Sequence, residues 1–525
     1  MSVPLLPLTS LQQLHRRGFL HRAALVACTP FLGTRLVQAA PKGVVFKENP
    51  FSLGVASGDP VSDGVVLWTR LAPHPLEDAG GMPKEAVAVH WEVARDEHFH
   101  DVIQKGTETA IPASAHSVHV EVSGLQPDRV YWYRFIAGGE SSPVGRTRTA
   151  PAAGVIPASV RFAVSSCQHY EYGYFNAYDH MLQDDLRVVF HLGDYIYEYG
   201  AMDQRPRRHH GKEAVDLAGY RTRYAQYRTD PALQKVHAAF PWVVTWDDHE
   251  FHNNCAGDQP VANIDPQKYL QRRAAAYQAY YENMPLRRPQ TPRGAYLDLY
   301  RSLNYGSLLQ FSVLDVRQYR THQPCGDRNQ PPCPGMFDPQ ATMLGKEQEA
   351  WLFQRLGSSP ARWNVLAQGV MMGRVDRAAG DDVKFSMDQW AGYDVSRRRL
   401  LQFLEDRKVS NPIVLTGDIH SNWVNDLQVD CDDRNASVVG TEFVGTSISS
   451  GGDGGDGEKY RTSVMADNPF VKFYNSQRGY LRCEVTPERW QTDFRVVDFV
   501  SRADSPCRTR ASFVVENGHA GAKEA

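Results

Sequence analysis

The chain has 525 residues, of which 42% are hydrophobic, and a formal net charge of −3 at pH 7. This length allows one large domain or two smaller ones, and the mildly acidic balance offers no electrostatic field for nucleic acid or another polyanion. Beyond the first 40 residues, no apolar run reaches the roughly 18 residues that a membrane span needs. We therefore expect a globular protein without a transmembrane anchor and without nucleic-acid binding.

The N-terminal segment 1–40 resembles an export signal. Arg16-Arg17 precede a modest apolar run, small residues follow near Ala39-Ala40, and the segment contains no acidic residue. This pattern predicts a twin-arginine signal peptide that engages the Tat export machinery and leaves the mature protein secreted or periplasmic. Because proteins on this route often fold around a cofactor before crossing, the signal also hints at a bound metal.

The cysteines fit an oxidising compartment. Of the eight, Cys28 leaves with the signal, and Cys325 and Cys333 flank a short turn-rich loop where we expect a disulfide. Cys167 is expected to stay a free thiol because it follows a predicted strand next to other reactive side chains. Three late cysteines offer a second candidate pair: Cys431, Cys483 and Cys507.

Short β segments separated by Gly and Pro turns occupy residues 44–150. Polar and apolar residues alternate clearly over His119–Val122 and Tyr131–Phe135. This pattern predicts an antiparallel β-sandwich of fibronectin or immunoglobulin type. Residues 150–159 are rich in Ala and Pro and are expected to form the linker to a second region.

The second region, 159–515, has a different pattern. Apolar runs of four to six residues, most ending in polar or charged residues, alternate with helix-like stretches such as 269–284. Continuous apolar strands separated by helices predict an α/β architecture in which the sheet is covered on both faces. Toward the end, the glycine-rich run 451–457 is either a mobile loop bordering a site or a flexible linker, and 517–525 resembles a disordered tail.

Reactive side chains follow four separate predicted strands. Each is a weak signal alone, since an Asp at a strand end is more often a turn residue and a Cys there more often fills the core. Their recurrence matters, because ligands in such folds bind outside the carboxyl ends of the strands. The residues, which together predict one metal site, are Cys167, Asp194, Tyr197, Asp247, Asp248, His249, Asp418 and His420.

The donor types indicate which metals fit. Thiolate, phenolate, carboxylate and imidazole together suit trivalent iron, whereas carboxylates without sulfur or nitrogen suit calcium or magnesium. The two oxygens of Asp194 allow it to bridge neighbouring ions. Two metals about 3.5–4 Å apart can clamp the attacking and leaving oxygens of an in-line phosphoryl displacement.

Four motifs carry a family resemblance. "SSCQ" from Ser165, "GDYIY" from Gly193, "WDDHE" from Trp246 and "GDIH" from Gly417 together resemble the metallophosphoesterase pattern of PhoD-type alkaline phosphatases. The resemblance covers almost the whole mature chain. It implies a metallophosphoesterase α/β sandwich core after the N-terminal β-sandwich, and hydrolysis of phosphate esters by direct attack of metal-bound hydroxide.

The resemblance also implies a ligand set for iron. Carried over position by position, it assigns one Fe³⁺ to Cys167, Asp194, Tyr197 and His420. Asp194 would bridge this iron to calcium.

The same resemblance implies one or two Ca²⁺ ions beside the iron. Asp248 stands where many metallophosphoesterases have Asn, and it is expected to bind calcium together with Asp418, while Asp247 reaches a second calcium. His249 occupies the position of the family's catalytic histidine, which stabilises the phosphoryl group or protonates the leaving oxygen. Asp194 is expected to be catalytic as well as a ligand.

Three further residues are candidates for substrate binding. Arg228 belongs to an arginine-rich segment whose spacing also fits a solvated helix face, and Arg317 ends a strand on the functional side. Asn254 follows the acidic run and can add an oxygen or serve as a turn residue. His209 and His210 are expected at the surface.

Two alternative functions fit the sequence. The same site can prefer phosphodiesters, including phospholipids, as a phosphodiesterase or phospholipase D does. From another class, the chain can be a secreted calcium-binding protein without catalysis. The thiolate and phenolate donors argue against the second alternative, because a purely structural calcium site has no use for them.

Overall fold

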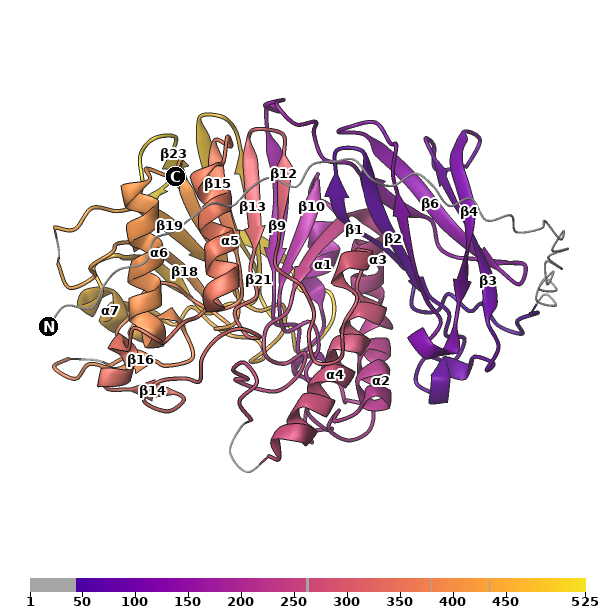
Figure 1. Cartoon of the computed structure of the whole chain (residues 1–525), viewed down its shortest axis with the longest axis horizontal. Coiled ribbons are helices and arrows are strands. Elements are labelled where there is room, and N and C mark those ends of the chain that lie inside the picture. Colours follow the sequence, from indigo (N-terminus) through magenta and orange to yellow (C-terminus); the bar gives the residue numbers. More distant parts are fainter. Residues whose placement is uncertain (1–43, 261–263, 379, 434) are drawn as a thin grey trace, which may run out of the picture. The chain divides into compact units, whose positions relative to one another are not determined.

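The computed structural model describes residues 44–525 apart from 261–263, 379 and 434, so the expected signal 1–40 lies outside the described residues. Two large β-sheets dominate the described chain (Figure 1). The first has ten strands in the order β24 (Lys523–Glu524), β23 (Cys507–Glu516), β22 (Arg489–Val497), β21 (Gly479–Val485), β9 (Val160–Ser165), β10 (Val188–Leu192), β11 (Pro241–Thr245), β1 (Val55–Val61), β2 (Gly64–Arg70) and β5 (Ser117–Val122).

The second sheet has seven strands. Their order is β12 (Arg301–Tyr305), β13 (Leu309–Val313), β15 (Trp363–Ala367), β17 (Pro412–Thr416), β19 (Gly440–Val444), β18 (Asn422–Leu427) and β20 (Val471–Asn475). In each sheet the central strands pair in parallel with their immediate neighbours. In the first sheet β10 lies between β9 and β11, and in the second the pairs are β13 with β15, β15 with β17, and β17 with β19. Several of these are buried at every position, which explains their continuous apolar runs.

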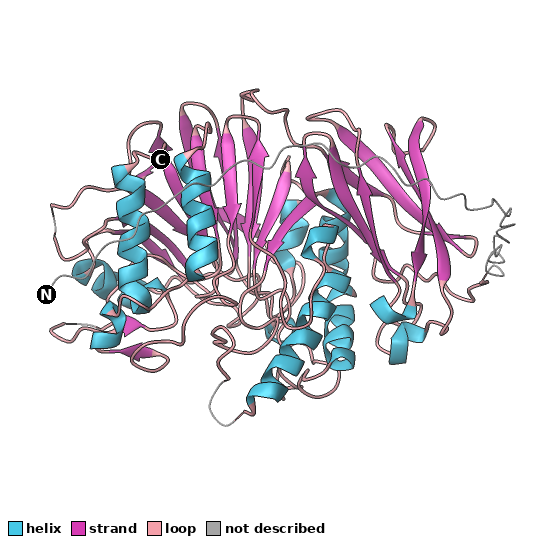
Figure 2. Ribbon diagram, viewed as in Figure 1, coloured by secondary structure: helices cyan, strands magenta, loops and turns pink. Residues whose placement is uncertain are grey.

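The sheets pack face to face between helices, which confirms the predicted α/β sandwich (Figure 2). The ring centroids of Phe162 and Phe190 in the first sheet lie 5.4 and 4.5 Å from that of Phe311 in the second. One outer layer comprises α1 (Asn176–Met181), α2 (Leu217–Arg228), α3 (Pro231–Ala239) and α4 (Pro266–Asn283). On the seven-stranded sheet lie α5 (Gly345–Gly357) and α6 (Asp394–Asp406), while α7 (Glu458–Asp467) packs beside β20.

The N-terminal strands form the predicted sandwich, with one addition. A further sheet packs its apolar face on β1, β2 and β5, and those strands also continue the ten-stranded sheet, because β1 pairs in parallel with β11. This pairing covers what would otherwise be an open edge at β11. The further sheet contains β3 (Val87–Ala94), β4 (Val102–Ala110), β6 (Val130–Ala137), β7 (Glu140–Ser141) and β8 (Gly145–Arg148).

Two predictions about the chain's covalent and terminal structure need correction. Residues 517–525 are not a disordered tail, because β24 pairs with β23 and Ala522 N–H donates to Asp426 Oδ1 at 3.0 Å. The Cys325–Cys333 disulfide is confirmed. The second pair is wrong, since the three other candidates are free thiols: Cys431, Cys483 and Cys507. Among the described helices, none is both long and apolar enough to cross a membrane.

Candidate metal centre

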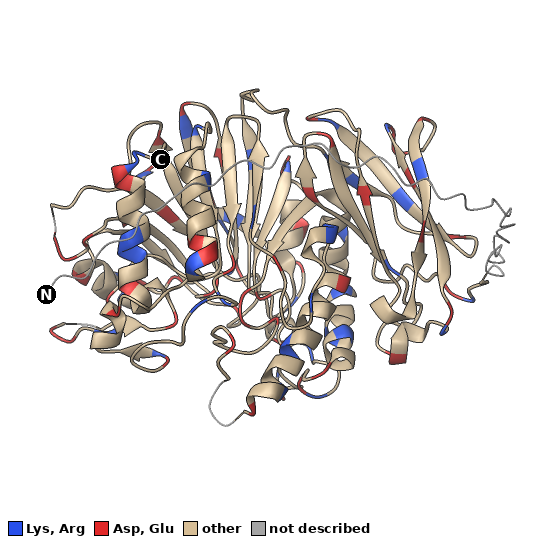
Figure 3. Ribbon diagram, in the orientation of Figure 1, with Lys and Arg blue, Asp and Glu red and all other residues tan. Residues whose placement is uncertain are grey.

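Four candidate ligands lie at the same position relative to the end of a parallel strand. Cys167, Asp194, Asp247 and Asp418 each lie two residues after the last residue of their strand, β9, β10, β11 and β17 respectively. The carboxyl ends of parallel strands meet at one edge of a sheet, and both sheets contribute here. Figure 3 shows acidic residues gathered in the loops below the central strands.

The backbone of these loops is strained in a consistent way. Cys167, Asp194 and Asp418 adopt left-handed conformations with φ of 58°, 56° and 63°, which cost free energy in residues other than glycine and cluster at functional sites. Glu250 connects the loops that follow β10 and β11, because its buried carboxylate accepts the N–H of Asp194 at 3.1 Å and of Asp247 at 2.9 Å. Sequence reasoning missed Glu250, although it belongs to the "WDDHE" motif.

Position 193 requires a glycine, because the loop that follows β10 there packs closely against the loop that follows β11. The φ of Gly193 is +104°, and a Cβ built there would lie 2.3 Å from Asp247 Cβ and 2.5 Å from its backbone nitrogen. We expect Gly193→Ala to lower the free energy of unfolding by at least about 3 kcal/mol, because overpacking adds to backbone strain. Gly139→Ala, at φ +87° with nothing within 4 Å, should lose only about 1–2 kcal/mol. Equal losses in chemical denaturation would show that the contact with Asp247 is unimportant.

The four predicted iron ligands lie together. The donor atoms of Cys167, Asp194 and His420 are all within 4.8 Å of one another. The Tyr197 hydroxyl donates to Asp194 Oδ2 at 2.7 Å and lies 3.1 Å from His420 Nε2. These donors come from three different loops, and the fold brings them to one buried point.

The carboxylates continue this cluster on one side. Ligand atoms of Asp194, Asp248 and His249 lie within 4.8 Å of one another, as do those of Asp247, Asp248 and Asp418. Asp194 belongs to the first and second groups, and Asp248 to the second and third. The three groups therefore adjoin one another, as ions that share bridging ligands require.

Arg317 lies inside the acidic part of the cluster. This fully buried side chain pairs with Asp247, with Asp388 at 2.8 Å and with Asp418 at 3.2 Å. Asp388 was missed in the sequence because it follows a two-residue strand, β16 (Phe385–Ser386), rather than a long apolar run. Arg317 thus contacts the carboxylates, and its contact with substrate stays a prediction.

One arginine does not neutralise this many acids. Asp247 Oδ2 and Asp248 Oδ1 are buried and accept no hydrogen bond from any residue in the described part of the chain. A buried carboxylate oxygen without a partner is costly, and a cation is the partner that satisfies several at once. The side chains present therefore fit a metal-binding centre.

Burial and mutual repulsion shift the protonation of the ligands. Burial raises the pKa of Cys167, and the carboxylates of Asp194 and Asp418 raise it further. Burial likewise raises the pKa of Asp194 well above its usual range, with Asp248 adding to the effect and the opposing charge of His249 offsetting part of it. Burial lowers the pKa of His420 to about 3, which keeps the imidazole neutral. A bound cation would favour the deprotonated thiol and carboxyl groups.

Metal removal is therefore expected to destabilise the protein in a pH-dependent way. In folded protein stripped of metal, burial raises the pKa of Asp194 and Cys167 above the pKa that each group has in the unfolded chain, about 3.9 and about 8.5. The two groups therefore stabilise the stripped folded state below these unfolded pKa values, and this contribution to stability is lost as the pH rises above them. Chelation should lower Tm by at least about 5 °C, and by more at about pH 9 than at about pH 6. Thermal unfolding of loaded and stripped protein measures the difference, and a gap that narrows as pH rises would contradict the assignment.

His249 is held by a carboxylate that the sequence analysis did not single out. Its Nδ1 lies 2.8 Å from Glu198 Oε2, so Nδ1 carries a proton and donates it to the carboxylate. Burial lowers the pKa of His249, but the charges of Asp248, Glu198 and Asp194 outweigh burial and raise it well above its usual value. These charges favour the protonated ring, and Nε2 makes no hydrogen bond within the described part of the chain.

The structure does not bring Arg228 to the cluster. Its guanidinium is buried, donates to Asn283 O at 2.8 Å and stacks on Trp68 at 4.3 Å. We therefore reject both a substrate contact and a solvated helix face for this residue. Asn254, in contrast, does lie at the cluster, since its N–H donates to Asp248 Oδ2 at 2.6 Å.

A fourth buried group resembles a metal site by composition and contains His169, Glu171 and His209. Both ring nitrogens of His209 are engaged, by the Tyr227 hydroxyl at 3.1 Å and the Tyr199 carbonyl at 3.0 Å. The guanidinium of Arg223 lies 3.1 Å from Nδ1 and would repel a cation. His209 is thus a packed core residue, not the surface residue expected from the sequence.

An α/β sandwich that gathers thiol, phenol, imidazole and carboxylate donors at the ends of its strands defines a metal-dependent enzyme. The model of the PhoD-like phosphatase family matches residues 162–494, and that of its N-terminal domain matches residues 38–151. Alkaline phosphatase D of Bacillus subtilis (strain 168) is 50% identical over 498 residues, covering 94% of this chain and 85% of the relative. A solved structure titled "Structure of PhoD" superposes with a TM-score of 0.89 at 50% identity, covering 92% of this chain and 93% of the other.

The chain belongs to the PhoD-like phosphatase family and is a phosphoric ester hydrolase. This confirms the family and the class of enzyme that the motifs predicted.

Proposed function

We propose that this protein is an exported phosphoesterase that uses one Fe³⁺ and one or two Ca²⁺ ions. One observation carries the proposal: two chemically different sets of donor atoms lie next to each other, and Asp194 belongs to both. One set offers thiol, phenol and imidazole, and the other offers carboxylates. Such a pair of sets suits a hard trivalent ion beside calcium.

The ligands divide between the ions by donor type. Iron would be held by Cys167, Asp194, Tyr197 and His420. Calcium would be held by Asp194 with Asp248 and Asp418, and a second calcium by Asp247. When bound, these cations supply activated water for direct in-line attack and neutralise charge on the phosphoryl oxygens.

The chain's own groups complete the reaction. His249 presents a proton at Nε2 to the leaving oxygen, because Glu198 occupies Nδ1. Arg317 limits repulsion among the carboxylates when they are gathered at one point. No side-chain nucleophile is needed, since attack on phosphorus is direct.

The sequence and the disulfide support a proposal for the location of the protein. Residues 1–40 have the features of a twin-arginine signal, and the Cys325–Cys333 bond is stable in oxidising compartments. We propose that the protein folds with its metals before Tat export and acts in the periplasm or outside the cell. Fusing residues 1–40 to a reporter and blocking the Tat pathway would test the route.

The substrate class is tested by comparing a nitrophenyl phosphate monoester with the corresponding diester at alkaline pH. For this test the protein should be produced by export through its own signal and assayed with calcium present. Its iron and calcium contents should be measured in the same sample. Faster cleavage of the monoester is the expected result for an alkaline phosphatase. Faster cleavage of the diester would shift the function to a phosphodiesterase or phospholipase, and cleavage of neither with both metals present would refute the proposal.

A further inference from the structure

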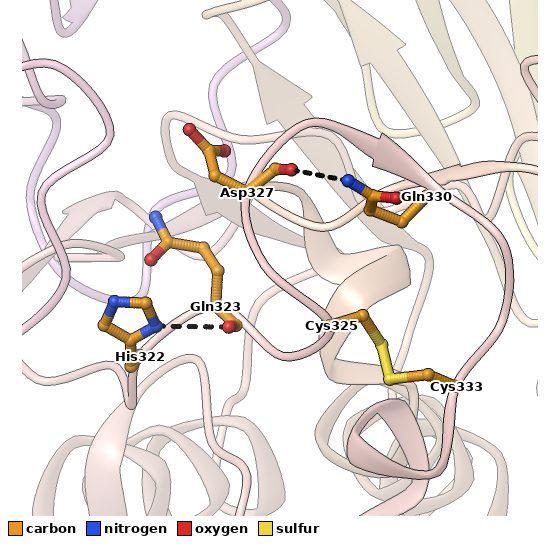
Figure 4. The surroundings of a disulfide bond; sticks show 6 residues. All are labelled: His322, Gln323, Cys325, Asp327, Gln330 and Cys333. Atoms are coloured by element: carbon orange, nitrogen blue, oxygen red, sulfur yellow. Dashed lines mark hydrogen bonds between the residues drawn. A yellow bond between two sulfur atoms is a disulfide. The ribbon is translucent and has the colours of Figure 1, made fainter. Parts of the chain in front are cut away.

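A disulfide-closed loop reaches the acidic side of the centre. Cys325 and Cys333 close a loop that carries Asp327, and Figure 4 shows the side chains of Asp327 and Gln323 pointing away from the disulfide. Both side chains contact Asn254, which lies more than 60 residues earlier in the chain. The loop therefore connects a covalent bond to the acidic cluster through one asparagine.

Asn254 is fixed at three of its four polar atoms. Its N–H donates to Asp248 Oδ2 at 2.6 Å, and its carbonyl accepts from Gln323 Nε2 at 2.7 Å. The side-chain Nδ2 lies 2.8 and 2.7 Å from the two carboxylate oxygens of Asp327. Nothing in the described chain donates to Oδ1. Because a carboxylate only accepts hydrogen bonds, the amide atom that faces Asp327 is the nitrogen Nδ2, and the other is the oxygen Oδ1.

We propose that Asp327 is a positioning residue for the calcium beside Asp248. By binding Nδ2 of Asn254, Asp327 turns the amide oxygen toward this cation, and the Cys325–Cys333 disulfide holds Asp327 in place. Amide oxygens are ligands that calcium accepts alongside carboxylates, and partners behind such ligands tune metal affinity. The inference rests on the proposed calcium site and adds to it a role for the loop.

The disulfide matters because little else anchors this loop. The two residues of β14 (Asn329–Gln330) pair with β16, and Met387 N–H donates to Arg328 O at 3.0 Å. Apart from the contacts with Asn254, the hydrogen bonds of Asp327 within the described chain are local, such as Arg328 N–H to Asp327 Oδ1 at 2.7 Å. Without the covalent closure, Asp327 would lose part of its order, and Asn254 would be free to rotate.

The test uses the full exported protein with its iron retained, stripped of calcium and titrated with CaCl₂ while Tm is followed. Asp327→Ala should raise the half-saturating calcium concentration about tenfold or more, and Asp327→Asn, which keeps an acceptor oxygen, by less. The paired change Cys325→Ser with Cys333→Ser should raise it by a smaller factor than Asp327→Ala. Adding the cysteine changes to Asp327→Ala should have no further effect, since the bond then has no carboxylate to position. Asp338→Ala is the control, because within the described residues this exposed carboxylate binds only a local N–H, that of Gln340 at 2.8 Å.

Iron content should be the same in all of these variants. Equal calcium response in wild type and Asp327→Ala would overturn the role of Asp327, and additive effects of the two changes would overturn its link to the disulfide. A wild-type protein without any calcium response would instead refute the proposed calcium site, and the inference with it.

Discussion

Asp194→Asn is expected to abolish metal loading and activity together. The carboxylate takes part in both donor sets, lying within 4.8 Å of the iron-type donors and of Asp248, and it accepts from the Tyr197 hydroxyl at 2.7 Å. An amide offers one oxygen instead of two and no charge, so it cannot bridge two cations. We expect activity to fall by about 10²- to 10³-fold or more, the scale of losing one group that stabilises a transition state.

Elemental analysis and steady-state kinetics on the same preparation measure this effect. The matched control is Asp184→Asn, because Asp184 is also a largely buried acid, paired with Arg482 at 2.9 Å and with the Tyr480 hydroxyl at 2.7 Å outside the cluster. The control should lose stability but keep its metals and its kcat. Full activity with normal iron content in Asp194→Asn would refute the assignment of the bridging ligand.

Part of the site was predictable because the fold repeats one local arrangement. Each apolar run ends at a fixed distance before a reactive residue, and the parallel pairing of the strands converts this sequence spacing into spatial proximity. Cys167, Asp194 and Asp247 follow neighbouring strands of one sheet, so their meeting could be inferred without coordinates. Asp418 has the same spacing but follows β17 of the second sheet, so its place beside them depends on how the two sheets pack. The N-terminal sandwich was predictable for a similar reason, since alternation with a period of two requires one buried face.

The residues that the sequence analysis missed act through tertiary contacts. Glu198 and Glu250 follow no strand at the recurring distance, and Asp388 follows only the two-residue strand β16. Each matters because of a partner more than 50 residues away. Glu198 pairs with a histidine of another loop, for example, and nothing within its own segment indicates this. Arg228 was misjudged because helical spacing shows which residues share a face but not whether another sheet covers that face.

The histidine and its carboxylate should separate catalysis from metal binding. His249→Gln is expected to lower kcat by about 10²- to 10⁴-fold, the usual contribution of a general acid, while iron and calcium contents stay near those of wild type. Glu198→Gln should lower kcat by about 10- to 100-fold, because the amide can donate to Nδ1 and favour the wrong tautomer. KM should change little in either variant, since neither side chain is proposed to bind the ground-state substrate.

The decisive measurement is how the loss depends on the leaving group. A proton delivered from Nε2 matters most when the departing alcohol is a poor leaving group, so His249→Gln should be far more harmful for an alkyl phosphate than for a nitrophenyl phosphate. Glu198→Gln should show the same trend, but with a smaller difference between the two substrates, because Glu198 acts through His249. A defect of equal size for both substrates would show that His249 stabilises the phosphoryl group rather than protonating the leaving oxygen, and it would leave Glu198 as a residue that only orients the ring.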